Sequence, residues 1–166
     1  GLSTGLVYAP AMDAQPEEIQ GLAKVVARRG GIYATHMRSE GGTLLEAIEE
    51  ALAVARASGV RLQISHLKTA GRANWGKLDA ALEKIRAAQA AGVEVASDRY
   101  PYTASCTDLD VILPTWAAQG ERAAILARLR DPAERAKIRA EMAAARDEKY
   151  WEKVWVGSTR HPDNAP

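Results

Sequence analysis

The chain has 166 residues, of which 47% are hydrophobic and 26% charged, a composition typical of a folded domain with its own core. Lysine and arginine number 22 against 21 aspartates and glutamates, so the net charge of +1 gives no basic field for nucleic acid. A single cysteine excludes an internal disulfide and favours a reducing compartment such as the cytoplasm. No apolar run approaches the roughly 18 residues of a membrane span, so we expect no membrane partner.

Four short apolar segments in the first 100 residues predict β-strands, at residues 5–8, 31–36, 60–66 and 93–98. They are apolar on both faces, as expected of parallel strands that are covered by helices. Their ends recur with a period of about 30 residues, the length of one strand–helix–strand unit. The pattern therefore predicts consecutive strand–helix units in a parallel sheet.

The segments between these strands have the spacing of amphipathic helices. One apolar stripe runs along residues 44–55 and another along residues 78–88, with charged residues mostly on the opposite faces. Glycine tolerates the left-handed conformation that follows a helix C-terminus, and glycines stand where each helix should end. They are Gly30, Gly31, Gly59 and Gly92.

Beyond Tyr102 the pattern changes. Residues 103–108 are polar, and Pro114 interrupts the apolar segment that follows them. Residues 122–146 are rich in alanine, arginine and glutamate and predict two helices, with Pro132 at a position that favours a helix start. Residues 151–158 alternate between apolar and polar side chains, which predicts one further strand.

Four or five parallel strands fit two α/β architectures: an open doubly wound sheet, or part of a (β/α)8 barrel, which takes about 250 residues to close. A nucleotide-binding doubly wound sheet should carry a glycine-rich phosphate loop, and residues 1–6 do not form one. We therefore predict part of a (β/α)8 barrel over residues 1–106, a helical excursion near the barrel mouth over residues 107–150, and a return strand with a C-terminal loop over residues 151–166.

Two histidines each end a predicted strand, one strand–helix unit apart: His36 and His66. In a parallel sheet both strand ends lie at the same edge, where barrel enzymes carry their active sites. Two neutral imidazoles at one edge suit a divalent metal, so we predict that His36 and His66 bind zinc or a similar ion. A hydrogen-bonded structural pair and a general-base role for either histidine are the alternatives.

Other polar residues near the strand ends have less specific signals. Lys68 is a candidate for binding a substrate carboxylate, with a solvated loop lysine as the alternative. We assign a structural role to Asp98 and an exposed loop position to His161. Cys106 has no histidine close to it in the sequence, which argues against a nucleophilic cysteine.

Several longer motifs resemble one known family. They are GLSTGLVYAP (1–10), GGIYATHMRSE (30–40), QISHLK (63–68), RANWGK (72–77) and DRYPYTAS (98–105). Together they are similar to the central part of the N-acyl-D-amino-acid deacylases (D-aminoacylases) of the amidohydrolase superfamily, and the resemblance extends over nearly the whole chain. It implies a zinc-dependent (β/α)8 enzyme that hydrolyses the amide of a small-molecule N-acyl-D-amino acid.

The resemblance also implies roles for particular residues. His36 and His66 match the two metal ligands that end the fifth and sixth barrel strands. Lys68 and Tyr100 match residues that bind the substrate carboxylate or polarise its amide. Cys106 corresponds to a carboxylate-binding serine of the family, or Ser105 does if the alignment slips by one position.

The family's other metal ligands and its general-base aspartate have no counterpart in this sequence. The sequence starts at Gly1 rather than at methionine, so we expect a fragment of a longer enzyme that holds one or two zinc ions. By itself the fragment should be inactive and bind zinc weakly or not at all. A cyclic amidohydrolase of the dihydroorotase or dihydropyrimidinase type is the enzymatic rival. Such relatives often use a lysine in the stretch that matches residues 1–8, and this chain has none there.

A rival from another functional class is a non-catalytic module that associates with itself. An isolated group of barrel strands would have open edges and an inner face without an opposite wall. The burial of several large aliphatic side chains is worth as much as the net stability of a domain, so their exposure predicts self-association or pairing with the rest of the chain. The expected inner side chains are Val7, Ile32 or Tyr33, Leu62 or Ile64, and Val93 or Val95.

Overall fold

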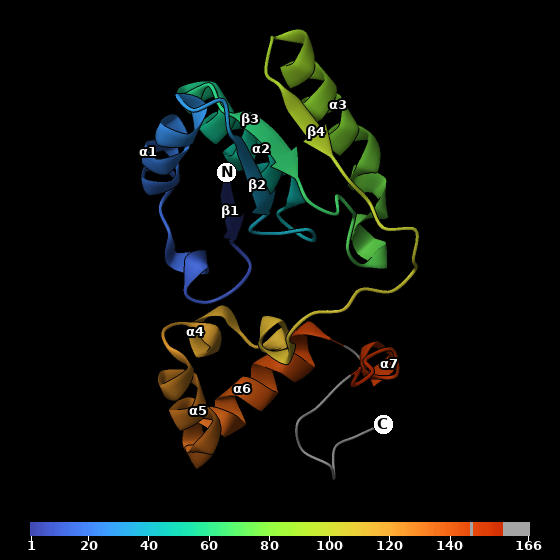
Figure 1. The fold of residues 1–166 in the computed structure, drawn as a ribbon. Coiled ribbons are helices and arrows are strands. Elements are labelled where there is room, and N and C mark those ends of the chain that lie inside the picture. The colour runs from blue at the N-terminus through green and yellow to red at the C-terminus, as the bar shows by residue number, and fades with distance from the viewer. Residues whose placement is uncertain (147, 158–166) are drawn as a thin grey trace. The chain divides into compact units, whose positions relative to one another are not determined.

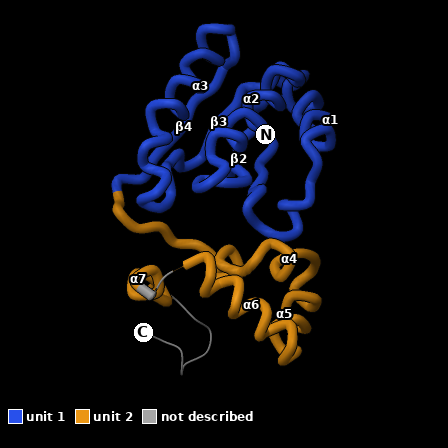
Figure 2. Tube along the Cα trace, turned by 180° about the vertical axis from the view of Figure 1, so that it is seen from behind, with its two compact units in different colours: residues 1–101 blue, residues 102–166 orange. Residues whose placement is uncertain are grey.

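The computed structural model describes residues 1–146 and 148–157 and divides the chain into two compact units. The first unit covers residues 1–101 and the second begins at Tyr102 (Figure 2). The boundary lies close to residue 106, where the predicted barrel part ends. The candidate site residues His36, His66, Lys68 and Tyr100 therefore all belong to the first unit.

The first unit is a four-stranded parallel sheet with strand order β1-β2-β3-β4 (Figure 1). A helix follows each of the first three strands, which confirms the predicted strand–helix units. The strands are β1 (Leu2–Gly5), β2 (Ile32–His36), β3 (Arg61–Ile64) and β4 (Val95–Ser97). The helices are α1 (Pro16–Ala27), α2 (Leu44–Ser58) and α3 (Leu78–Ala90).

The first strand lies earlier in the chain than the predicted segment 5–8. Gly5 ends β1, and the amide of Tyr8 donates a hydrogen bond to the carbonyl of Gly5 at 3.0 Å, which closes a turn where a strand was expected. The β-branched and aromatic residues of this segment therefore did not decide its conformation. The register places Gly5 beside His36, so the turn lies next to the end of β2.

One face of the sheet holds most of the core. Thr35 and the apolar residues of the same face are buried among apolar side chains of α1, α2 and α3, which form one cluster with them. The buried apolar strand residues are Tyr33, Leu62, Ile64 and Val95. Four of the residues expected to line an inner barrel wall thus pack against the helices instead.

The opposite face of the sheet is mostly small and polar. Ser3, Arg61 and Ala96 are exposed and Gln63 is half-buried. Ile32, at 43% exposure, is the large apolar side chain among the strand residues of this face. The prediction of an exposed aliphatic face is therefore wrong. Side chains alternate along each strand, and the large apolar ones other than Ile32 point towards the helices.

The second unit consists of short helices in the part of it that the structure describes. They are η3 (Leu109–Ile112), α4 (Thr115–Ala118), α5 (Arg122–Arg130), α6 (Pro132–Ala145) and α7 (Glu148–Trp151). The two helices predicted over residues 122–146 are confirmed. The side chain of Asp131 accepts hydrogen bonds from the amides of Ala133 and Glu134, both at 2.9 Å, and so caps the start of α6.

The return strand predicted over residues 151–158 is absent from its described part, residues 151–157. Trp151 ends α7, and residues 152–157 contain no strand. Residues 158–166, with the predicted loop residue His161, lie outside the described residues. Among the residues that are described, no helix has both the length and the apolar character needed to cross a membrane.

Candidate functional site

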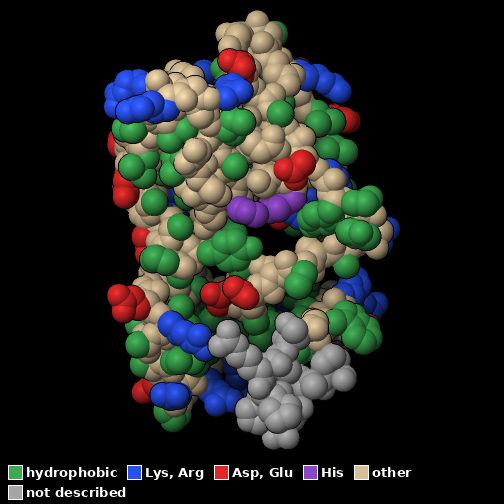
Figure 3. All heavy atoms as spheres, in the orientation of Figure 1, with side chains coloured by type: hydrophobic (Ala, Val, Ile, Leu, Met, Phe, Trp, Pro, Cys, Tyr) green, Lys and Arg blue, Asp and Glu red, His purple; other side chains and the backbone are tan. Residues whose placement is uncertain are grey.

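The two predicted histidines meet at one edge of the sheet. His36 is the last residue of β2, and His66 follows β3 by two residues. Nδ1 of His36 contacts Nε2 of His66, and the ring centroids are 4.5 Å apart. The described histidines form one contiguous patch on the face shown in Figure 3. Parallel register therefore brings together two side chains that lie 30 positions apart in the sequence.

The backbone of His66 adopts an uncommon conformation for a residue with a side chain, at φ +43°. Asp98 holds it there, because Oδ1 of Asp98 accepts the His66 amide at 2.6 Å and Oδ2 accepts Nε2 of Gln63 at 2.8 Å. The backbone carbonyl of Asp98 also accepts the amide of Leu67 at 2.9 Å. Asp98 thus orients the loop that carries His66, in line with the structural role expected for it.

Lys68 lies beside His66 and is already engaged by protein groups. Its Nζ is 2.9 Å from the carbonyl oxygen of His66, 2.9 Å from Nδ1 of His66 and 2.5 Å from Oε1 of Glu40. Oε1 of Glu40 is also 2.6 Å from Nδ1 of His66. This oxygen is buried and makes these close contacts without an aligned hydrogen bond. The carboxylate of Glu40 therefore contacts both Lys68 and His66, which also contact each other directly.

Aromatic rings flank both histidines. The ring of Tyr100 is 6.3 Å from that of His66, and Nζ of Lys68 is 5.3 Å from the centre of the Tyr100 ring. The ring of Tyr8 is 6.3 Å from that of His36 and meets it edge-on. The sequence reasoning selected Tyr100, and it missed both Tyr8 and Glu40 as site residues. Their positions in the segments that follow β1 and β2 could have indicated both residues, because these segments begin at the same edge of the sheet as the histidines.

The donor set suits a metal only in part. Burial lowers the pKa of His36, and the neighbouring charge of His66 lowers it further. A neutral imidazole presents the lone pair that zinc needs. Zinc takes about four ligands, however, and the part of the chain that the structure describes contains no group of three histidine, cysteine or acidic side chains arranged for a metal. His36 and His66 are the two imidazoles that come into contact in this part of the chain.

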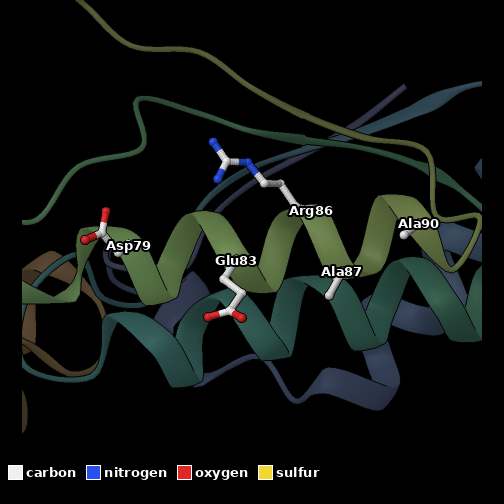
Figure 4. Close-up of a pocket in the computed structure, with 5 residues that line it drawn as sticks. All are labelled: Asp79, Glu83, Arg86, Ala87 and Ala90. Atoms are coloured by element: carbon white, nitrogen blue, oxygen red, sulfur yellow. The ribbon is translucent and has the colours of Figure 1, made fainter.

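Two other places on the chain do not add to this site. Cys106 is exposed and belongs to the second unit. A surface hollow lies along α3 and is lined by Asp79, Glu83, Arg86, Ala87 and Ala90 (Figure 4). All its lining residues come from one helix, so it has a single wall and does not enclose a ligand.

Comparison with known proteins gives a consistent result, although no family model matches the chain. N-acyl-D-glutamate deacylase of Alcaligenes xylosoxydans xylosoxydans is 45% identical over 119 residues, which cover 72% of this chain and 24% of that protein. The crystal structure of N-acyl-D-glutamate deacylase from Bordetella bronchiseptica, complexed with zinc and a phosphonate inhibitor, is 44% identical with a TM-score of 0.59. The match covers 60% of this chain and 21% of that structure.

A crystal structure of D-aminoacylase, described as defining a novel subset of amidohydrolases, is 42% identical with a TM-score of 0.60. The match covers 63% of this chain and 22% of that structure. The chain is homologous to a segment of the N-acyl-D-amino-acid deacylases. It spans about a quarter or less of the length of the curated deacylase relatives that it matches. Its four strands correspond to part of the barrel of these deacylases, which confirms the predicted fold class.

Proposed function

We propose that this chain is the segment of a metal-dependent N-acyl-D-amino-acid deacylase that supplies two metal ligands and part of the substrate pocket. The contact between Nδ1 of His36 and Nε2 of His66 at adjacent strand ends carries the proposal. Zinc in the homologous N-acyl-D-glutamate deacylase supports the choice of metal. When bound, zinc would polarise the amide carbonyl and lower the pKa of a water towards about 7.

The remaining site residues orient the substrate. Lys68 offers a cation to the substrate carboxylate, and an incoming carboxylate would have to share or replace the contact of Lys68 with Glu40. Tyr100, whose ring lies 6.3 Å from that of His66, offers a phenol hydroxyl as a hydrogen-bond donor. Cys106 takes the position of a serine in the resemblance, and a thiol is a weaker hydrogen-bond donor to a carboxylate than a hydroxyl. The general-base aspartate is expected outside this chain.

Cobalt titration of the 166-residue chain tests the metal ligands. We expect weak binding by the wild-type chain, with a change in the visible cobalt spectrum as imidazole nitrogen replaces water. His36→Asn and His66→Asn should each weaken binding by at least about tenfold, because each removes one of two imidazole ligands. His161→Asn is the matched control and should leave binding unchanged. Equal affinities of all four proteins would refute the assignment of His36 and His66.

Hydrolysis assays test the reaction. The product of the complete reading frame that encodes this chain should release free amino acid from N-acetyl-D-glutamate or N-acetyl-D-methionine and not from the L-isomers. The 166-residue chain alone should show no release above background, because it lacks the general base. Turnover of dihydroorotate in place of the N-acyl-D-amino acids would select the cyclic-amidohydrolase alternative. Zinc-dependent turnover by the chain alone would contradict our account of the missing residues.

Two further proposals concern the self-association of the chain and its location in the cell. Self-association is supported by the open edges of the sheet at β1 and β4, rather than by an exposed aliphatic face. Light scattering should show a dimer or larger species, and a monodisperse monomer would exclude it. A cytoplasmic location is supported by the single, unpaired Cys106 and is tested by fractionation of the native cells.

A further inference from the structure

Arg38 joins three segments at the edge of the sheet that carries the histidines. It lies two residues after His36, and its Nε and Nη2 donate to the carboxylate of Glu50 on α2 at 3.0 and 2.8 Å. Its Nη1 donates to the carbonyl of Met12, and its Nη2 donates to the carbonyl of Ala14 at 2.9 Å. Met12 and Ala14 belong to the segment between β1 and α1. One guanidinium therefore ties this segment both to α2 and to the loop after His36.

The chemistry of this contact requires arginine. The planar guanidinium binds the carboxylate of Glu50 with two nitrogens and still has donors left for two carbonyl groups. The side chains of Arg38 and Glu50 are 32% and 17% exposed, so water replaces these bonds less readily than at an open surface. The hydrogen bond from Arg38 to Glu50 raises the pKa of the guanidinium further above its ordinary value.

The tethered segment carries Tyr8 into the candidate site. The amide of Met12 donates to the carbonyl of Tyr8 at 2.8 Å, so Met12 is bound by Arg38 through its carbonyl and by Tyr8 through its amide. The Tyr8 ring lies over Gly5, where a Cβ atom would come within 2.8 Å of the ring. The same ring is 6.3 Å from the His36 ring. A continuous series of contacts thus connects Arg38 with the surroundings of His36.

We propose that Arg38 is a positioning residue, which fixes the segment from Leu6 to Gln15 through the carbonyls of Met12 and Ala14 and so holds the Tyr8 ring beside His36. Glu50 fixes the direction of the guanidinium. The importance of His36 rests on the proposed function, whereas the positioning itself is a property of this chain. A second arginine–glutamate pair on α2, Arg56 with Glu49, has side chains 42% and 49% exposed and is a natural control.

Amide hydrogen exchange and NMR of the histidine rings test this proposal on the 166-residue chain. Arg38→Lys keeps the charge and the ion pair with Glu50, but an ammonium group does not reproduce the fork that reaches both carbonyls. We expect exchange at Met12, Asp13 and Ala14 to become roughly tenfold faster, as the loss of one or two hydrogen bonds predicts. The ring-proton shifts of His36 should move towards those of Tyr8→Leu. Arg56→Lys should change neither quantity.

Each outcome is decisive. Unchanged exchange and unchanged His36 shifts in Arg38→Lys would overturn the proposal, and so would a Tyr8→Leu variant whose His36 shifts equal those of the wild type. Exchange that accelerates equally in α3 would show a general loss of stability and would also overturn it. Glu50→Gln, which keeps the shape and the acceptor oxygen, should give a smaller effect of the same kind. Failure of the wild-type chain to bind cobalt would count against the proposed function only, because these readouts need no metal.

Discussion

Each of the two units of the chain is stabilised internally by a different kind of interaction. In the first unit, apolar side chains from β2, β3, β4 and the helices α1, α2 and α3 form one buried cluster, and the partly buried Leu2 of β1 packs against it. In the described part of the second unit, the buried apolar residues are Ala117, Ala118 and Ile138. Because burial of apolar surface is the dominant favourable term in folding, the first unit should supply most of the stability of the chain.

Polar contacts replace the core in the second unit. The indole nitrogen of Trp116 donates to Glu141 at 2.9 Å, and Nζ of Lys137 is 4.2 Å from the centre of the Trp116 ring. Arg146 donates to the carbonyl of Ile112 at 3.0 Å. Contacts of this kind at exposed sites contribute about 0.5–1 kcal/mol each. We therefore expect the first unit to tolerate little change in its core, whereas the second unit depends on many small interactions.

Truncation of one buried isoleucine in each unit tests this contrast most directly. Ile64 is 0% exposed in the central part of the sheet and Ile138 is 2% exposed in α6. Ile64→Ala should lower the free energy of unfolding by about 3–5 kcal/mol, and Ile138→Ala by about 2 kcal/mol, since a thinly packed site collapses more readily around the cavity. Urea unfolding followed by hydrogen exchange in each unit measures both. Equal losses would show that the second unit has a core of comparable quality.

Removal of the carboxylate of Asp98 tests how far the first unit stabilises its own site. Asp98→Ala deletes the acceptor of the His66 amide and should cost about 1–2 kcal/mol, at the low end for a charged acceptor because Asp98 is exposed. The His66 ring should also lose its contact with His36, which NMR cross-peaks between the two rings would reveal. Asp79→Ala, on the exposed side of α3, is the control. An unchanged His66 environment would mean that the sheet alone fixes this loop.

Loss of the helix cap at Asp131 should have a smaller and purely local effect. Asp131→Ala removes the acceptor for the amides of Ala133 and Glu134 and should destabilise α6 by about 1 kcal/mol. Hydrogen exchange should accelerate in the first turn of α6 and stay unchanged in β2 and β3. Asp131→Asn retains a capping oxygen and should restore most of the protection. Faster exchange throughout the first unit would show that the two units unfold together.

The smallest expected effect is a pH dependence on the outer side of α2. The hydrogen bond from Arg56 holds the pKa of Glu49 below its ordinary value of 4.5. The folded state therefore binds fewer protons than the unfolded state, and the stabilisation is present above pH 4.5 and disappears as the pH falls through the lowered pKa. Because the pair is exposed, we expect less than about 0.5 kcal/mol. The urea midpoints of wild type and Glu49→Gln should differ slightly at pH 7, and the difference should shrink as the pH falls below 4.5.

Local patterns in the sequence predicted what depends on local structure. The apolar spacing along residues 44–55 located α2, and Gly59, at φ +69°, caps it as expected. The period of the strand ends brought His36 and His66 together, because parallel register follows from the repeat itself. These parts of the fold needed no knowledge of distant contacts.

Other parts depended on contacts that the sequence does not show. The turn from Gly5 to Tyr8 forms because Gly5 leaves room for an aromatic ring, and this displaced the predicted first strand. The strands were predicted to be apolar on both faces, which is wrong, because Ser3, Gln63 and Ala96 make one face mostly small and polar. Glu40 became a site residue only when folding placed its carboxylate against both His66 and Lys68.

The small, polar face of the sheet has a consequence for biosynthesis. Because the large aliphatic strand residues turn towards the helices next to them in sequence, each strand–helix pair can bury its own apolar surface as it leaves the ribosome. Such pairing is close in sequence and fast, and it does not wait for distant strands. The face with Ser3, Gln63 and Ala96 meanwhile tolerates water. These strand–helix units therefore expose little large apolar surface on the face of the sheet while the rest of the chain is being made.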